Sequence, residues 1–147
     1  MIQPFALSDL DRILKIELEA FPKSPYDWAT FINLHYLYLE TFLVYVSPAL
    51  GRKEDQILGY IIFTEEGHII SIAVHPRHRR RRIGKELLER AMTAPHIEKV
   101  WAEVRKSNQG AQAFYLHMGF KVTGVVPNYY ENEDALIFQW TPSPESD

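Results

Sequence analysis

Residues 71–88 read SIAVHPRHRRRRIGKELL, and this stretch decides the fold. It opens with an apolar run that predicts a buried strand, which Pro76 ends. Five arginines and Lys85 then lead into a predicted helix from Ile83 to about Thr93. A helix N-terminus already presents unpaired N–H groups and partial positive charge. Because added cations oppose that dipole unless an anion binds, the stretch predicts a site for phosphate groups.

The charge of the chain is unevenly distributed. The 147 residues carry a net charge of −3, while residues 77–85 hold six Lys/Arg and no acid, so the remainder carries −9. Nucleic-acid-binding domains usually carry positive charge over a broad face. A single cluster of positive charge instead indicates that the ligand is a compact polyanion. The arginine run is also compatible with a nucleic-acid patch or a solvated basic face. No aromatic side chains lie within it to stack on bases, so we do not expect a nucleic-acid partner.

Length and composition predict a single domain at residues 1–140, followed by a disordered acidic tail at 141–147. The absence of cysteine excludes disulfides, thiolate metal sites and a cysteine nucleophile. The first residues lack the basic-then-apolar pattern of a secretion signal, and no apolar run reaches the ~20 residues of a membrane helix. We therefore expect a cytoplasmic protein without a membrane partner. Its oligomeric state cannot be predicted, although Tyr36 and Tyr38 look exposed enough for an interface.

Apolar periodicity, together with proline and glycine positions, predicts the order β-α-α-β-β-β-α-β-α-β-β. This order implies an α/β fold in which a mixed, twisted sheet of about seven strands carries about four helices on its faces. The predicted strands are 2–5, 41–47, 57–64, a strand ending at 75, 99–105, 120–126 and 134–140, and the predicted helices end at 22, about 40, about 93 and 118.

The element order and the phosphate loop together resemble the GNAT superfamily of acetyl-CoA-dependent N-acyltransferases. That family has Arg/Gln-x-x-Gly-x-Gly/Ala after a buried strand, and residues 79–84 read RRRRIG. The first glycine of the pattern is replaced by Arg82. Glycine lets the backbone approach a pyrophosphate without a Cβ atom, and arginine is tolerable there if its φ is negative. The shape of this loop is therefore open.

Later motifs extend the resemblance over nearly the whole chain. Residues 103–108 read EVRKSN, followed by Ala111-x-x-x-Tyr115 and Gly119-Phe120, as in the family's second conserved region. Residues 128–135, NYYENEDA, resemble the branch that acetylates protein N-termini, which includes the ribosomal-protein-alanine acetyltransferases. The sequence Phe21-Pro22-x-x-Pro25-Tyr26 is similar to the substrate-side loop of that branch.

The resemblance implies two catalytic roles. A carboxylate at a strand end takes a proton from the amine, and Glu103 fits because it shares one face of its strand with Trp101 and Arg105. The alternative is a surface glutamate paired with Arg105 or a lysine. A tyrosine then protonates the departing thiolate, and Tyr115 fits by its motif. Helical spacing alone instead favours Tyr115 as a core aromatic.

The resemblance also implies binding residues. Acetyl-CoA is expected against Ile72, Ala73, Val74, Arg79, Arg80, Arg81, Arg82, Ile83, Gly84, Lys85, Asn108 and Tyr115. The acceptor is expected against Phe21, Pro22, Tyr26, Tyr129 and Tyr130, although the last two equally fit the cap of a hairpin. No metal site is predicted, because His75 and His78 straddle a proline and lack an acidic third ligand. His68 and the other histidines show no usable constellation.

We therefore predict an acetyl-CoA-dependent N-acetyltransferase that acts directly on a primary amine, with the α-amine of a protein N-terminus as the leading acceptor. Acetylation of a lysine side chain or of a small amine is compatible with the same fold. A non-catalytic CoA-binding or RNA-binding module is the alternative from another class. The identity of the acceptor's first residues is not predicted.

Overall fold

The computed structural model describes residues 1–48, 51–52, 55–79 and 82–142. Arg80, Arg81 and most of the predicted tail lie outside these residues. Within them the chain forms four α-helices and seven strands, and their order is the predicted one. Short 3₁₀ turns at Leu7–Asp9 and Pro76–His78 are additional. In the described residues, no helix is both long enough and apolar enough to span a membrane.

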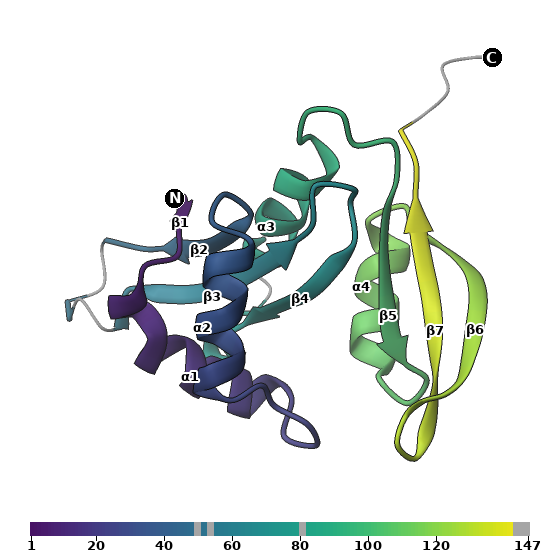
Figure 1. Ribbon diagram of the computed structural model, residues 1–147, viewed down its shortest axis with the longest axis horizontal. Coiled ribbons are helices and arrows are strands. Elements are labelled where there is room, and N and C mark those ends of the chain that lie inside the picture. The colour runs from purple at the N-terminus through teal and green to yellow at the C-terminus, as the bar shows by residue number, and fades with distance from the viewer. Residues whose placement is uncertain (49–50, 53–54, 80–81, 143–147) are drawn as a thin grey trace. The chain divides into compact units, whose positions relative to one another are not determined.

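The seven strands pair in two sheets (Figure 1), where one mixed sheet was predicted. The chain correspondingly divides into two compact units. Unit 1 comprises residues 1–64 and 70–90, and unit 2 comprises residues 65–69 and 91–147. The sequence pattern identified the strands, but it carries no information on which strand edges meet.

Unit 1 contains a four-stranded sheet in the order β1-β2-β3-β4. Strand β1 (Ile2–Pro4) pairs antiparallel with β2 (Phe42–Val46), which pairs antiparallel with β3 (Ile57–Phe63). Strand β4 (Ile69–Val74) completes the order. Every residue of β3 is buried, as expected for a central strand covered on both faces.

Helices account for the burial of both faces of β3. Helix α1 (Leu10–Ala20) and helix α2 (Trp28–Leu37) contribute Ile13, Ile16 and Phe31 to one hydrophobic cluster with Tyr60. Helix α3 (Ile83–Met92) lies against the other face, at Gly59. A Cβ atom at Gly59 would lie 2.8 Å from the Ala73 carbonyl oxygen and 3.2 Å from Leu87, so this contact requires glycine.

Unit 2 contains a three-stranded antiparallel sheet in the order β5-β7-β6, together with helix α4 (Gln109–His117). Its strands are β5 (Val100–Arg105), β6 (Lys121–Tyr130) and β7 (Glu133–Trp140). Strand β6 continues beyond the predicted end at residue 126. The ladder with β7 shifts register between Val126 and Tyr130 and continues past Pro127.

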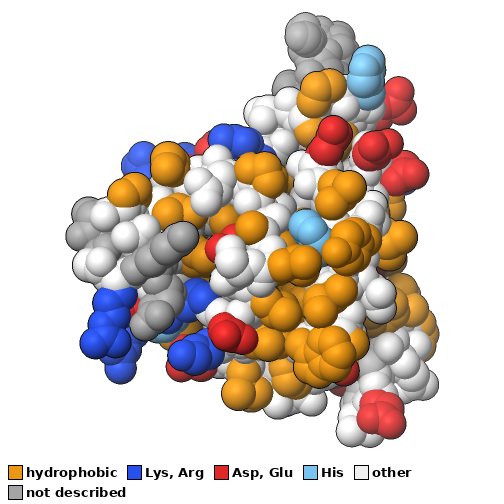
Figure 2. All heavy atoms as spheres, turned by 60° about the vertical axis from the view of Figure 1, so that its left-hand side comes forward, with side chains coloured by type: hydrophobic (Ala, Val, Ile, Leu, Met, Phe, Trp, Pro, Cys, Tyr) orange, Lys and Arg blue, Asp and Glu red, His pale blue; other side chains and the backbone are white. Residues whose placement is uncertain are grey.

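Large hydrophobic side chains also reach the surface, as Figure 2 shows for one face of the protein. On α2, Trp28, Tyr36 and Leu37 are each more than 60% exposed, at 62%, 63% and 69%. Tyr38, which was expected to be exposed like Tyr36, instead packs partly against the hydrophobic cluster of unit 1. The expected exposure therefore holds for Tyr36 and is wrong for Tyr38.

Candidate active site

The predicted site residues are divided between the two units. Unit 1 holds the predicted phosphate loop, residues 72–74 of β4 and the loop from Phe21 to Tyr26. Unit 2 holds Glu103, Asn108, Tyr115, Tyr129 and Tyr130.

The phosphate loop reaches α3 through an unusual backbone conformation. Arg82 has a φ of +63°, in the left-handed region that favours glycine. The condition under which arginine would be tolerable here, a negative φ, is therefore not met. The Arg82 carbonyl accepts the N–H of Glu86 at 3.0 Å, which starts the helix. The backbone thus keeps the conformation of a glycine turn, and it leads into a helix N-terminus that suits an anion.

The remaining predicted binding residues of unit 1 lie at a sheet edge and in a packed loop. Strand β4 ends the order of its sheet, and an edge strand can pair with an extended ligand, as predicted for residues 72–74. Phe21 and Tyr26 pack partly against the hydrophobic cluster, while Pro22 is exposed. The Tyr26 ring meets Phe31 edge-on at 5.7 Å.

In unit 2, strand β5 presents Glu103 as the sequence predicted. Val100, Ala102 and Val104 are buried on one face, while Trp101, Glu103 and Arg105 share the other. The predicted alternation is confirmed.

Glu103 is paired with a histidine that the sequence analysis set aside. His68 Nε2 lies 2.7 Å from Glu103 Oε1, and the His68 ring stacks on Trp101 at 5.1 Å, with 5° between the ring planes. The Tyr129 hydroxyl donates to the same Oε1 at 3.4 Å. The interpretation that His68 belongs to no constellation is therefore wrong. His68 directly precedes β4, forms an isolated bridge with Trp101, and is 35 residues from Glu103, so no local sequence pattern signals this contact.

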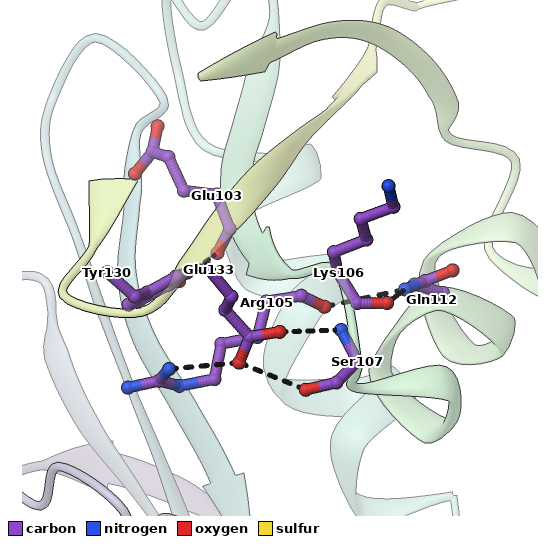
Figure 3. A network of polar contacts seen from close by, with 7 residues as sticks. All are labelled: Glu103, Arg105, Lys106, Ser107, Gln112, Tyr130 and Glu133. Carbon is purple, nitrogen blue, oxygen red and sulfur yellow. Dashed lines mark hydrogen bonds and ion pairs between the residues drawn. The ribbon is translucent and has the colours of Figure 1, made fainter. Parts of the chain in front are cut away.

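Arg105 does not pair with Glu103, which was the alternative for that carboxylate. Its Nη1 instead lies 3.0 Å from Glu133 Oε1, and its guanidinium lies 4.1 Å from the centre of the Tyr130 ring. Glu133 also accepts the Ser107 backbone N–H and hydroxyl, each at 3.0 Å, as Figure 3 shows. We call Glu133 with Arg105 and Ser107 the hairpin clamp. It joins the β6–β7 turn to the end of β5.

Tyr115 is buried, with 4% of its surface exposed, on the face of α4 that meets the sheet. Its ring lies 5.1 Å from Phe120 and 5.7 Å from Phe138. Burial raises the pKa of the Tyr115 phenol above its ordinary value of 10, and the nearby Tyr130 and Glu103 raise it further. Tyr115 therefore packs among aromatic core residues and keeps its proton at neutral pH.

The other predicted residues of unit 2 have defined local roles. The Asn108 side-chain oxygen accepts the N–H of Ala111 at 3.0 Å and caps α4, and its amide nitrogen takes no part in that bond. Tyr129 and Tyr130 end β6, and their rings meet edge-on at 4.9 Å. The Tyr130 hydroxyl donates to the Glu103 carbonyl at 3.3 Å, so both tyrosines contact Glu103.

Comparison with known families decides the class of this protein. Residues 10–120 match the Acetyltransferase (GNAT) family. The chain belongs to the GNAT acetyltransferase family. The resemblance to this family that the sequence predicted is confirmed. The protein is an N-acetyltransferase and hence an acyltransferase.

Relatives of this GNAT enzyme occur in archaea and bacteria. An uncharacterised N-acetyltransferase of Methanocaldococcus jannaschii is 36% identical, over 93% of this chain and 88% of the relative. An N-alpha-acetyltransferase of Sulfurisphaera tokodaii is 32% identical, over 89% and 86%. A putative ribosomal protein bS18-alanine N-acetyltransferase of Bacillus subtilis is 28% identical, over 92% and 91%.

Solved structures agree with this GNAT assignment. Ard1 from Thermoplasma volcanium has a TM-score of 0.83 at 26% identity, and the match covers 96% of each chain. Naa20 from Chaetomium thermophilum, solved in complex with a bisubstrate analogue, has a TM-score of 0.80 at 25% identity. That match covers 96% of this chain and 86% of Naa20. The α/β fold is thereby confirmed.

Proposed function

We propose that this GNAT enzyme transfers the acetyl group of acetyl-CoA directly to the α-amine of a protein or peptide N-terminus. The main support for this chemistry is the position of Glu103 on strand β5. Its carboxylate is held in place by His68, whose Nε2 lies 2.7 Å from Oε1. A carboxylate fixed in this way is suited to take a proton from an ammonium group.

Glu103 offers one oxygen to such an amine. A carboxylate only accepts hydrogen bonds, so His68 carries its proton on Nε2. Both hydrogen bonds that the side chain makes in the described residues are accepted by Oε1, from His68 and Tyr129. Oε2 is then the atom that would take the proton, while His68 and Tyr129 orient the carboxylate. The side chain is 15% exposed, which leaves it accessible.

Tyr115 is suited to the opposite proton transfer. Transfer from a thioester to an amine breaks a C–S bond and forms a C–N bond, so a proton is lost at nitrogen and gained at sulfur. The phenol holds its proton throughout the neutral range, as a proton donor must, although its raised pKa makes it a weaker acid than an ordinary tyrosine. The absence of cysteine removes the thiol nucleophile that an acyl-enzyme route would most readily use.

Acetyl-CoA, when bound, supplies the activated acetyl group. The left-handed turn at Arg82 and the N-terminus of α3 support the binding of its phosphates here, because unpaired backbone N–H groups at a helix N-terminus favour an anion. Residues 72–74 of β4 would pair with its extended pantetheine arm, and Asn108 would offer its amide nitrogen. Arg79 and Lys85, both exposed, add positive charge.

A protein N-terminus is favoured as acceptor by the named relatives and by the sequence of the β6–β7 hairpin. The Sulfurisphaera relative is named an N-alpha-acetyltransferase, and Tyr129 and Tyr130 contact Glu103 from that hairpin. Phe21, Pro22 and Tyr26 are the other residues that we propose for acceptor binding.

The test uses two matched peptides, acetyl-CoA and mass spectrometry. One peptide has a free N-terminus and no lysine, and the other has a blocked N-terminus and one internal lysine. We expect acetylation of the first alone. Acetylation of the second alone would establish a lysine acetyltransferase, and reaction of neither with CoA still bound would point to small amines.

Variants of the proton-transfer residues then test the mechanism. Glu103→Gln keeps the shape of the side chain but is not a base, so we expect kcat to fall about 10²-fold or more. Tyr115→Phe removes the proton donor and is expected to lower kcat with little change in the KM for acetyl-CoA. Unchanged turnover in either variant would remove that residue from the mechanism.

A further inference from the structure

Glu17, on α1, is a charged residue that is buried in the core of the protein. It is 2% exposed, and no other charged side chain in the described residues is so buried. Removing a carboxylate from water is costly unless its oxygens accept hydrogen bonds from well-placed donors. No sequence motif marks Glu17, which lies on the buried face of α1 with Ile13 and Ile16.

Three segments of unit 1 meet at this carboxylate. The Tyr60 hydroxyl, from β3, donates to Oε1. The backbone N–H of Tyr26, from the loop between α1 and α2, donates to Oε2 at 2.9 Å. Tyr60 is in turn 2.8 Å from the Ser71 hydroxyl on β4, directly before the residues predicted to pair with the pantetheine.

Glu17 also holds the loop at both of its ends. Its backbone carbonyl accepts the N–H of Phe21 at 2.8 Å, and its side chain accepts the N–H of Tyr26. Pro22 and Pro25 between them have no N–H to donate. Within this six-residue segment the Ser24 N–H donates to the Phe21 carbonyl oxygen at 3.3 Å, and the two Glu17 bonds anchor its ends.

We propose that Glu17 is a positioning residue that fixes the conformation of residues 21–26 for acceptor binding. The inference rests on the proposed function, which assigns this loop to the acceptor. Glu17 acts through the Tyr26 N–H and contacts neither substrate. Its Tyr60 bond, by contrast, satisfies a buried hydroxyl and serves the core.

Three variants separate positioning from ordinary core stabilisation. Glu17→Gln can place its carbonyl oxygen at the Tyr26 N–H and its NH2 group at the Tyr60 oxygen, while Tyr60 donates to Ser71. Glu17→Leu fills a similar volume but has no acceptor for Tyr26, and replacing a buried charge by an apolar group is often neutral or stabilising. Tyr60→Phe removes the core bond and leaves the loop bond in place.

The measurements are steady-state kinetics with the N-terminal peptide and exchange of the Tyr26 amide followed by NMR. In Glu17→Leu we expect the KM for the peptide to rise about tenfold, as for one lost hydrogen bond, with an unchanged KM for acetyl-CoA. Faster exchange at Tyr26 and an unreduced melting temperature should accompany it. Glu17→Gln and Tyr60→Phe should keep both the peptide KM and the slow exchange.

A wild-type peptide KM in Glu17→Leu would overturn the inference, and so would equal losses in Glu17→Gln and Glu17→Leu. Unprotected exchange at Tyr26 in the wild type would also overturn it, whatever the acceptor is. If the wild-type enzyme acetylates no peptide N-terminus, the proposed function fails, and the exchange data still report whether Glu17 holds the loop.

Discussion

Arg82 shows how one residue can keep a loop conformation that its side chain disfavours. Its φ of +63° brings the Cβ atom close to backbone atoms, at a cost of roughly 1–2 kcal/mol in a residue with a side chain. The phosphate loop of the family has glycine at this place. Arg82 therefore adopts a backbone conformation that glycine takes without strain, and the arginine is accommodated at the expense of stability.

Arg82→Gly should relieve this strain. Glycine also has more freedom in the unfolded chain, so we expect a net rise in the free energy of unfolding of roughly 0.5–1 kcal/mol. Arg82→Ala is the control, because alanine keeps the Cβ atom. Urea unfolding measures both. Equal stability of the two variants would contradict the strain, and weaker acetyl-CoA binding in both would show that the guanidinium itself contacts the ligand.

Glu17 gives the protein a predictable response to pH. Burial raises the pKa of this carboxyl above its unfolded value of 4.5, although the Tyr26 and Tyr60 hydrogen bonds oppose the rise. Below pH 4.5 both states bind the proton, and Glu17 adds no pH dependence. As pH rises from 4.5 through the folded pKa, the folded state holds more protons than the unfolded state, so stability falls.

Glu17→Gln should remove that fall. The difference in unfolding free energy between Glu17→Gln and the wild type should therefore shift in favour of the variant as pH rises from 4 to 7. Guanidinium unfolding at several pH values measures it. A difference that is independent of pH, or that shifts toward the wild type, would contradict the raised pKa.

Single residues were predictable from sequence where a local rule decides them. The outward alternation of Glu103 followed from the two-residue period of a strand. Two other features depend on segments that are far apart in the chain. His68 lies 35 residues from its partner Glu103, and Glu17 lies 43 residues from its partner Tyr60. The positive φ of Arg82 was not predictable, because arginine, like other residues with a side chain, favours a negative φ.

At the level of elements, the hairpin clamp determines where the end of β6 lies. Glu133 accepts three hydrogen bonds from Arg105 and Ser107, and the Arg105 guanidinium covers the Tyr130 ring. Tyr129 and Tyr130 therefore keep a fixed relation to β5 and to Glu103. The clamp serves the candidate site even though none of its members is proposed to touch the reacting atoms.

Glu133→Ala should loosen this hairpin. Loss of its hydrogen bonds, one of them to a charged group, should lower the unfolding free energy by about 1–2 kcal/mol. Hydrogen exchange of β6–β7 amides should accelerate, and the KM for the peptide should rise. Glu131→Ala, at an exposed residue of the same turn, is the matched control. The same effect in both variants would show that the turn, and not the clamp, is responsible.

Element order was predictable because proline and glycine separate strongly apolar segments along this chain. Pro22, Pro76 and Pro95 each follow or precede an element boundary. The length of β6 was underestimated, since a register shift carries the strand past Pro127. The division into two sheets could not be predicted, because the apolar pattern of a strand is the same whether or not its edges pair with a neighbouring strand.

For the whole molecule, the separation of charge predicts a response to salt. Six positive charges lie at residues 77–85, where we propose that the phosphates of acetyl-CoA bind, while the rest of the chain carries −9. The screening length falls from about 10 Å at 0.1 M salt to about 3 Å at 1 M. We expect the KM for acetyl-CoA to rise roughly three- to tenfold between these concentrations. A KM that does not change with salt would show that backbone amides carry the binding alone.

The stacking of His68 on Trp101 gives the protein an optical signal of its own. The two rings lie 5.1 Å apart and nearly parallel. An imidazolium in contact with an indole quenches its fluorescence more strongly than a neutral imidazole does. The chain has three tryptophans, so replacing Trp28 and Trp140 by phenylalanine would leave emission from Trp101 alone. The brightness of that single fluorophore would then report the protonation of His68 beside Glu103 directly, without substrate and without a dye.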